Sequence, residues 1–132
     1  MKVIKVTGAI IQERNKFLIC RRGPSEKAAG LWEFPGGKLE INESLEDCIL
    51  RELKEELDID AELHSLYDNY SFEAQDVIYD LYFFRIKGFS GNLSKTVHDK
   101  IKWVELQDFH NFSFLPGDGP IIKKLEKDSR VL

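Results

Sequence analysis

The segment from Ser44 to Leu57 constrains the fold most, because it carries the clearest helical pattern in the chain. Asp58 follows it, where helices often end on a left-handed residue, and Asp tolerates that conformation better than most side chains. The sequence therefore predicts a helix over residues 44–57 with one buried face. Its apolar side chains recur at every fourth position: Leu45, Ile49, Leu53 and Leu57.

Three glutamates are expected at the edge of this apolar face. At about 100° per residue, Glu56 falls within the apolar arc and Glu52 and Glu55 fall beside it. Like charges at this spacing repel one another, and a hard divalent cation with oxygen ligands would turn that repulsion into binding. The alternative is a solvated glutamate-rich face that pairs with neighbouring basic residues. The solvent side of the helix carries Asp47, Lys54 and Asp58.

The rest of the chain predicts mainly strands. Residues 2–11 and 16–21 are expected to form a hairpin, and residues 77–86, rich in aromatic and β-branched side chains, a central strand. The remaining predicted elements are strands at 61–70 and 101–106 and a helix at 120–127. Strands with two helices predict an α+β fold in which helices cover a mixed sheet, and 132 residues suit one domain over residues 1–132.

Composition excludes several classes of partner. The chain has 19 Lys and Arg against 23 Asp and Glu, a net charge of −4, which argues against a nucleic acid polymer or an anionic membrane. No apolar run approaches the roughly 20 residues of a membrane span, and the N-terminus has no apolar signal segment, so a cytoplasmic location is expected. Cys20 and Cys48 lie in apolar stretches and are predicted to be buried thiols rather than a disulfide or metal pair.

The turn before the predicted helix contains Pro35, Gly36 and Gly37. Adjacent glycines after a proline indicate that close backbone approach matters more here than side chains. This turn can bring a backbone carbonyl against the glutamates. Glu43 stands near the start of the helix, where a negative charge is favoured.

Together these residues resemble the Nudix box. In that pattern, five residues separate the glycine from the first glutamate, and seven more precede an Arg-Glu pair. Asp58 stands where the box has its second glycine, a change that the left-handed conformation of Asp makes tolerable. The matching positions are Gly37, Glu43, Arg51, Glu52, Leu53, Glu55, Glu56 and Ile59.

The resemblance implies a Mg²⁺-dependent hydrolase of nucleoside diphosphates linked to another group, built as an α/β/α sandwich with the Nudix fold. Glu52 is the implied base for the attacking water, Arg51 would orient its carboxylate, and Glu43 would support the site electrostatically. Mn²⁺ is a possible substitute for Mg²⁺. The implied metal ligands are Gly37, through its carbonyl, Glu52, Glu55 and Glu56.

The resemblance extends to the MutT subfamily through residues 6–11, 20–22, 30–38 and 115–120. Members cleave nucleoside triphosphates to monophosphate and pyrophosphate and include oxidised-guanine hydrolases and CTP pyrophosphohydrolases. For Phe34 the alternative is an ordinary core aromatic, and for Lys27 a solvated loop lysine. The implied substrate contacts are Arg22, Lys27, Glu33, Phe34, Pro35, Gly36 and Asp118.

Asp118 departs from the oxidised-guanine enzymes, which resemble this segment but carry Asn there. An ionised Asp only accepts hydrogen bonds, so it disfavours the guanine O6 and favours an exocyclic amine such as cytosine N4. CTP pyrophosphohydrolases have Asp at this position, and a cytidine or deoxycytidine triphosphate is therefore the expected substrate. A protonated Asp118 would reverse the argument, and a helix-capping role is the structural alternative.

Val97 falls where relatives often place a further glutamate ligand, and His98 or Asp99 could replace it.

The alternative substrates are 8-oxo-dGTP and ADP-ribose. A nucleotide-binding regulatory module without turnover is the alternative from another class, although all four glutamates of the box remain. The sequence leaves monomer and homodimer open.

Overall fold

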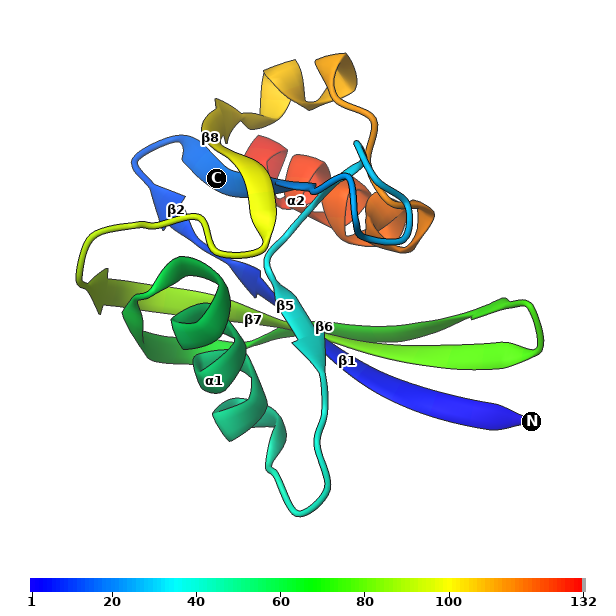
Figure 1. Ribbon diagram of the computed structural model, residues 1–132. Coiled ribbons are helices and arrows are strands. Elements are labelled where there is room, and N and C mark those ends of the chain that lie inside the picture. The colour runs from blue at the N-terminus through cyan, green and yellow to red at the C-terminus, as the bar shows by residue number, and fades with distance from the viewer. Residues whose placement is uncertain (132) are drawn as a thin grey trace. The chain divides into compact units, whose positions relative to one another are not determined.

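The computed structural model describes residues 1–131, with side-chain surroundings through Ser129 (Figure 1). Contacts along the chain divide it into two compact units. The first unit comprises residues 1–11 and 35–96, and the second comprises residues 12–34 and those from 97 onward. The single domain expected for residues 1–132 stays a prediction.

The first unit contains a four-stranded mixed sheet in the order β5-β1-β7-β6. Strand β1 runs parallel to β7, and the other neighbours are antiparallel. The central position predicted for residues 77–86 is confirmed, because β7 lies between β1 and β6. The strands are β1 (Lys2–Ile10), β5 (Gly36–Lys38), β6 (Asp60–Ala74) and β7 (Val77–Ser90).

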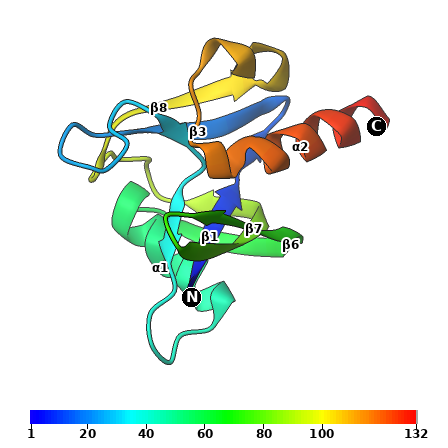
Figure 2. The same ribbon diagram turned by 90° about the vertical axis from the view of Figure 1, so that its right-hand side faces the viewer.

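Helix α1 (Leu45–Leu57) lies beside β5, β1 and β6 in the first unit (Figure 2). The Ser44 side chain accepts a hydrogen bond from the Asp47 amide at 3.0 Å and so begins the helix. Asp58 ends it in the left-handed conformation, with φ 56° and ψ 40°. Ile49, Leu53 and Leu57 are fully buried. The predicted helix, its terminator and its buried face are confirmed.

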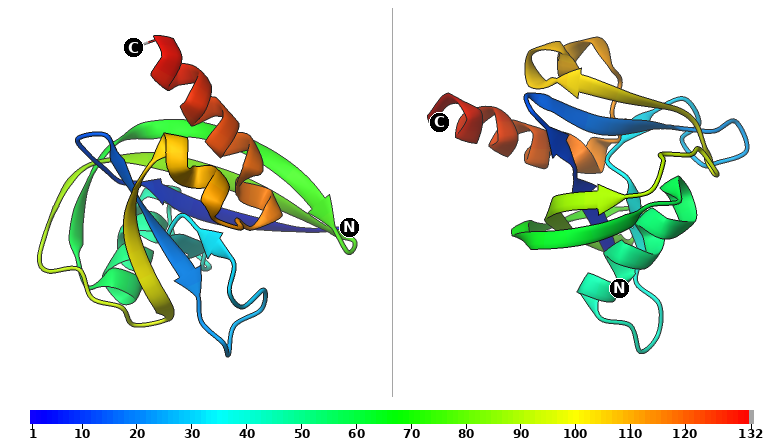
Figure 3. Two further views of the ribbon diagram at one scale, coloured as in Figure 1. Left: turned by 90° about the horizontal axis from the view of Figure 1, so that it is seen from above. Right: turned by 90° about the vertical axis from the view of Figure 1, so that its left-hand side faces the viewer.

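The second unit is built on β3 (Lys16–Arg22), which pairs with β2 (Gln12–Glu13), β4 (Trp32–Glu33) and β8 (His98–Glu105). Figure 3 shows β3 in blue beside β8 in yellow. Helix α2 spans Gly119–Val131 and extends the helix predicted over 120–127 at both ends. Two short 3₁₀ helices precede it, η1 (Leu106–Asn111) and η2 (Pro116–Asp118). The α+β class with a mixed sheet and helices is confirmed.

The predicted hairpin between residues 2–11 and 16–21 is wrong. Strand β1 pairs along its length with β7, from Lys2 opposite Val77 to Ile10 opposite Arg85. Only the short β2 turns back onto β3. Residues 2–11 are rich in Val, Ile and Thr and favour a strand, but this composition does not say which distant segment becomes the partner.

Both cysteines are free thiols with no exposed surface, as predicted. Burial raises the pKa of the Cys48 thiol above its ordinary value, so the thiol keeps its hydrogen at neutral pH. Cys48 also has a polar contact, because its Sγ lies 3.3 Å from Thr7 Oγ1. Its apolar neighbours in the sequence did not indicate this contact.

Candidate functional site

Gly37 and Glu52 meet where β5 passes under helix α1. A Cβ built on Gly37 would lie 2.5 Å from both Glu52 carboxylate oxygens. At Gly36 a Cβ would overlap the carbonyl oxygen of Thr7. Only glycines allow this approach, so the close backbone contact expected from the sequence is confirmed, and the Glu52 carboxylate rests directly on the backbone of β5.

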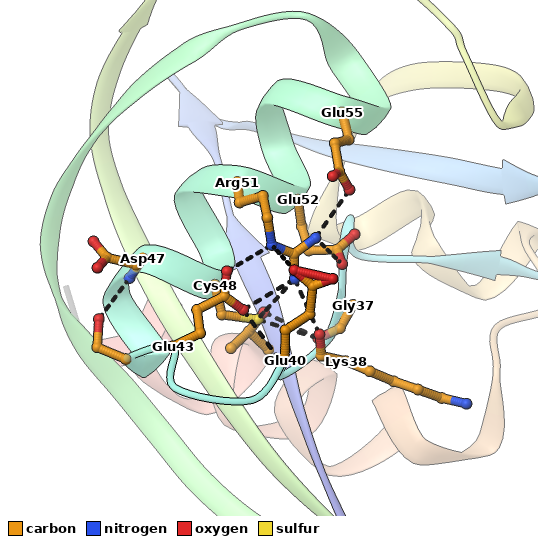
Figure 4. Close-up of polar contacts among 11 residues, drawn as sticks. Gly37, Lys38, Glu40, Glu43, Asp47, Cys48, Arg51, Glu52 and Glu55 are labelled. Atoms are coloured by element: carbon orange, nitrogen blue, oxygen red, sulfur yellow. Dashed lines mark hydrogen bonds and ion pairs between the residues drawn. The ribbon is translucent and has the colours of Figure 1, made fainter.

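Arg51 is the centre of the acidic cluster on α1 (Figure 4). Its Nε lies 2.6 Å from Glu43 Oε2, and its Nη1 lies 3.0 Å from Glu52 Oε1 and 2.9 Å from Glu55 Oε2. The exposed Glu40 lies 3.1 Å from Nε. One guanidinium therefore serves carboxylates from both the loop and the helix, and the orienting contact implied between Arg51 and Glu52 is present.

Hydrogen bonds from Arg51 lower the pKa of Glu43 to about 2, helped by the Glu40 amide, which donates to Glu43 Oε1 at 3.1 Å. In turn, bonds to Glu43 and then Glu52 raise the pKa of Arg51 above its ordinary value. Glu43 is thus held ionised next to the start of α1.

Glu56 and Glu55 differ in burial. Glu56 is 7% exposed, as its place within the apolar arc predicted, whereas the Glu55 side chain is 59% exposed. Thr96 fixes the helix end beside them, because its Oγ1 lies 2.6 Å from the Glu55 carbonyl oxygen and 2.9 Å from that of Glu56. No local pattern indicates this contact, because Thr96 lies 41 positions after Glu55 and 40 positions after Glu56.

The donor set on α1 and β5 fits a hard divalent cation. Glu52, Glu55, Glu56 and the Gly37 carbonyl offer only oxygen, the ligand that Mg²⁺ prefers. Within residues 1–131, three or more Asp, Glu, His or Cys side chains are nowhere gathered as closely as a metal ion requires. Instead, Glu52 and Glu55 turn to Arg51. The ligand set therefore stays a prediction, and metal binding would compete with Arg51 for these carboxylates.

A second polar group lies in the second unit, around Glu33. Arg22 Nη1 lies 2.9 Å from Glu33 Oε1, and His98 Nε2 lies 2.8 Å from Glu33 Oε2. The pairing of β3 with β8 sets Arg22 opposite His98. His98 is 7% exposed and begins β8, so it is a buried residue of the sheet and not part of a loop. Nothing local marks it, since Glu33 is 65 positions away.

Arg22 also shapes the loop that follows it. Its Nε donates to the Lys27 carbonyl at 2.5 Å, and its main chain bonds Leu31 and Gly30 at the loop base. The Lys27 residue itself is exposed. Contacts of Arg22 and Lys27 with substrate stay predictions, and the guanidinium of Arg22 is already engaged with Glu33.

Asp118 and Phe34 meet through the backbone of Phe34, whose amide donates to Asp118 Oδ2 at 3.0 Å. The Phe34 ring is 4% exposed and packs against Phe109 and Phe114, as in the core alternative. Pro35 is fully buried. Stacking of the Phe34 ring on a base, and the substrate contacts of Pro35 and Gly36, stay predictions.

The protonation of Asp118 bears on the expected preference for cytosine. Burial, with 8% of the residue exposed, raises its pKa to about 7, the Phe34 amide partly opposes this, and the negative charge of Glu33 adds to it. Both protonation forms are therefore populated near neutral pH. The argument for cytosine therefore applies to the ionised form of Asp118 alone, and the preferred base stays a prediction.

The side chains near Val97 have other partners than a metal. Val97 is 48% exposed. Asp99 pairs with Arg21 through two hydrogen bonds of 2.8 and 2.9 Å, and His98 pairs with Glu33. Neither replacement for the missing glutamate is poised as a ligand in this structure.

None of the helices within residues 1–131 combines the length and apolar character that crossing a membrane requires.

Known proteins show what this chain resembles. The NUDIX domain matches residues 1–125. A CTP pyrophosphohydrolase of Escherichia coli is 33% identical over 93% of this chain and 91% of its own length. An 8-oxo-dGTP diphosphatase of the same species is 31% identical over 96% of this chain and 99% of its own.

Solved structures agree. The ORF135 protein of Escherichia coli has a TM-score of 0.86 and 32% identity, over 96% of this chain and 91% of that one. A MutT protein of Methanosarcina mazei shares the fold, with a TM-score of 0.85 and 24% identity over 97% and 96% of the two chains. The expected Nudix fold is confirmed. Nudix enzymes generally use a divalent metal, and this chain belongs to the NUDIX domain family as a Nudix hydrolase.

Proposed function

We propose that this chain is a Mg²⁺-dependent nucleoside triphosphate pyrophosphohydrolase that releases nucleoside monophosphate and pyrophosphate. The observation that carries the proposal is the contact of the Glu52 carboxylate with the Gly37 backbone while Arg51 holds it from the other side. Glu52, Glu55, Glu56 and the Gly37 carbonyl would hold the metal. When bound, Mg²⁺ neutralises phosphate charge and lowers the pKa of water, and Mn²⁺ is expected to substitute for it.

Glu52 acts as the base in this proposal. Its side chain is 15% exposed and its Oε1 lies 3.0 Å from Arg51 Nη1, so the carboxylate is held in one orientation to accept a proton from the attacking water. Glu43 fixes Arg51 in turn, with two bonds of 2.6 and 3.0 Å. These residues contribute mainly by positioning the reacting groups, which is a main part of what proteins contribute to catalysis of phosphoryl transfer.

Cytidine and deoxycytidine triphosphates are the proposed substrates. The ionised form of Asp118 accepts a hydrogen bond from an exocyclic amine such as cytosine N4. The relative named CTP pyrophosphohydrolase supports this choice. Because the Phe34 amide donates to Oδ2, we assign Oδ1 to the base.

A second candidate substrate is 8-oxo-dGTP, and the raised pKa of Asp118 favours it. The protonated carboxyl donates a hydrogen bond, which matches the O6 carbonyl of an oxidised guanine. A relative named 8-oxo-dGTP diphosphatase adds support. No specific observation favours ADP-ribose as the substrate, and none favours a nucleotide-binding regulatory module without turnover.

The test is a substrate panel with Mg²⁺: CTP, dCTP, 5-methyl-dCTP, 8-oxo-dGTP and ADP-ribose. We expect pyrophosphate and monophosphate from a cytosine triphosphate. Glu52→Gln should abolish turnover, whereas Glu46→Gln, an exposed change in the first turn of the same helix, should not. Binding of triphosphates without any hydrolysis would support the silent module, and cleavage of ADP-ribose alone would replace the substrate class.

A further inference from the structure

Glu33 is held by two basic side chains from neighbouring strands of the second unit. At residues 20 and 21, β3 lies between β4, which carries Glu33, and β8, which begins at His98. The Glu33 carboxylate reaches both: Oε1 lies 2.9 Å from Arg22 Nη1, and Oε2 lies 2.8 Å from His98 Nε2. The side chains of Glu33 and His98 are 13% and 3% exposed. Both carboxylate oxygens are therefore engaged in a place that water reaches poorly.

The peptide bond that follows Glu33 leads directly to Asp118. Its N–H group is the Phe34 amide, which donates to Asp118 Oδ2 at 3.0 Å. One peptide unit thus joins the residue that His98 and Arg22 anchor to the residue proposed to read the base. A change at this anchor reaches Asp118 by two routes, through the position of the peptide and through the electric field of the Glu33 carboxylate.

The charges around Asp118 come from the same group of residues. The negative charge of Glu33 favours the protonated form of Asp118, and the positive charge of Arg22 opposes it. Arg22 pairs closely with Glu33 and more loosely, at 3.7 Å, with Glu26. Because an ionised carboxylate only accepts hydrogen bonds, His98 Nε2 carries the hydrogen between His98 and Glu33. This donor offsets part of the Glu33 charge, so the field at Asp118 depends on His98.

We propose that His98 is a positioning residue that acts through Glu33 to set the ionisation of Asp118, and with it the choice between cytosine and an oxidised guanine. This inference rests on the proposed function, because it takes Asp118 as the residue that reads the base. The donor on His98 weakens the field of Glu33 and so favours the ionised form of Asp118. That form accepts a hydrogen bond from cytosine N4, whereas the protonated form donates to the guanine O6.

One amide reports the state of Asp118 directly. Glu33-Phe34 is the only Glu-Phe pair in the sequence, so ¹³C-carbonyl glutamate with ¹⁵N-phenylalanine gives one coupled signal, from the Phe34 amide. A charged acceptor makes the stronger hydrogen bond, so we expect the amide proton to move downfield as Asp118 ionises. In the substrate-free wild type the midpoint should lie at about pH 7. Asp118→Asn should abolish this transition, which separates it from any titration of His98.

Two substitutions should move this midpoint in opposite directions. Glu33→Gln removes the negative charge, so the midpoint should fall by about one pH unit. That variant is labelled with glutamine instead, since no other Gln precedes a Phe in the sequence. His98→Phe keeps a ring but loses the donor, so the midpoint should rise, and His98→Gln restores a donor and should return it to the wild-type value. His110→Phe is the control, because His110 is exposed on η1.

The second measurement is the ratio of kcat/KM for CTP over 8-oxo-dGTP at pH 7. The ratio should fall in His98→Phe and keep its wild-type value in His98→Gln. Equal midpoints in the wild type, Glu33→Gln and His98→Phe would overturn the inference, and so would a His98→Gln variant that behaves like His98→Phe. A midpoint that moves while the ratio stays constant would overturn the effect on base choice.

The two proposals fail separately. A wild type that hydrolyses no triphosphate would overturn the proposed function, whereas the titration uses no substrate and still decides whether His98 acts on Asp118. Should His98→Phe not fold, Glu33→Gln decides, because an unmoved midpoint in that variant leaves His98 no route to Asp118.

Discussion

Arg51 donates two hydrogen bonds to Glu43, from Nε to Oε2 at 2.6 Å and from Nη2 to Oε1 at 3.0 Å. Bidentate pairs of this kind fix geometry as well as charge. Glu43→Gln keeps the shape but offers one acceptor and no charge, so Arg51 loses the anchor from which it orients Glu52. We predict that kcat for triphosphate hydrolysis falls by about tenfold to a hundredfold.

Steady-state measurement of pyrophosphate release checks this, with Glu46→Gln as the control on the exposed first turn of α1. If the two variants have the same kcat, Glu43 does not support the site.

Gly37→Ala tests the contact with Glu52. The added methyl would lie 2.5 Å from both carboxylate oxygens, so the carboxylate must leave its place. Because the displaced group is the end of a flexible side chain, the fold should survive while turnover falls by about a hundredfold or more. Gly88→Ala in β7 is the matched control, since nothing lies within 4 Å of its Cβ position. Thermal melting and pyrophosphate release separate the two effects, and retained turnover in Gly37→Ala would contradict the placement of Glu52.

Base preference should depend on pH through Asp118. As pH rises through about 7, the carboxyl loses its proton and changes from donor to acceptor. The ratio of kcat/KM for CTP over 8-oxo-dGTP is therefore expected to rise between pH 6 and 8. Asp118→Asn should lower cytosine preference and remove the pH dependence of the ratio. A ratio in that variant equal to the wild type at every pH would show that Asp118 does not read the base.

Asp118 also makes stability depend on pH. Its pKa is about 7 when folded and about 3.8 when unfolded, so the folded state binds more protons between these values. Stability should then fall as pH rises from about 4 to about 7 and level off above, by on the order of a few kcal/mol. Urea unfolding at pH 5, 6, 7 and 8 gives the free energy of unfolding of the wild type and of Asp118→Asn. The difference between the two proteins at each pH is the contribution of Asp118. Parallel pH profiles of the two proteins would contradict the raised pKa.

His98 should matter for stability in the second unit. His98→Ala removes a buried partner of Glu33 and leaves that carboxylate with Arg22 alone, so we predict a loss of about 1 to 3 kcal/mol. His110→Ala is the control, because His110 is exposed. Urea unfolding of both variants distinguishes a buried contact from a general effect of losing a histidine, and equal midpoints would rule the contact out as a source of stability.

Helix α1 could be predicted nearly to its ends because its signals are local. Ser44 caps it, Asp58 terminates it, and the apolar repeat fixes its buried face, all within one short segment. The same locality placed Glu56 on the buried side. The pattern of the box likewise located the residues that meet around Arg51.

What could not be predicted depends on distant partners. Strand β1 was expected to turn back onto residues 16–21, yet its parallel partner β7 begins at Val77, and a strand-forming composition cannot choose between them. The charge of Asp118 depends on burial, which its own segment does not reveal. The contact of His98 with Glu33 requires knowing that β8 lies beside β3.

Arg51 gives the acidic face of α1 a counter-ion that is part of the same chain. This internal cation offsets part of the negative charge of Glu43, Glu52 and Glu55 without any bound ion. Under the proposed function, metal binding is an exchange in which Glu52 and Glu55 leave Arg51 for the cation. Removal of the ion would then return these two carboxylates to the arginine.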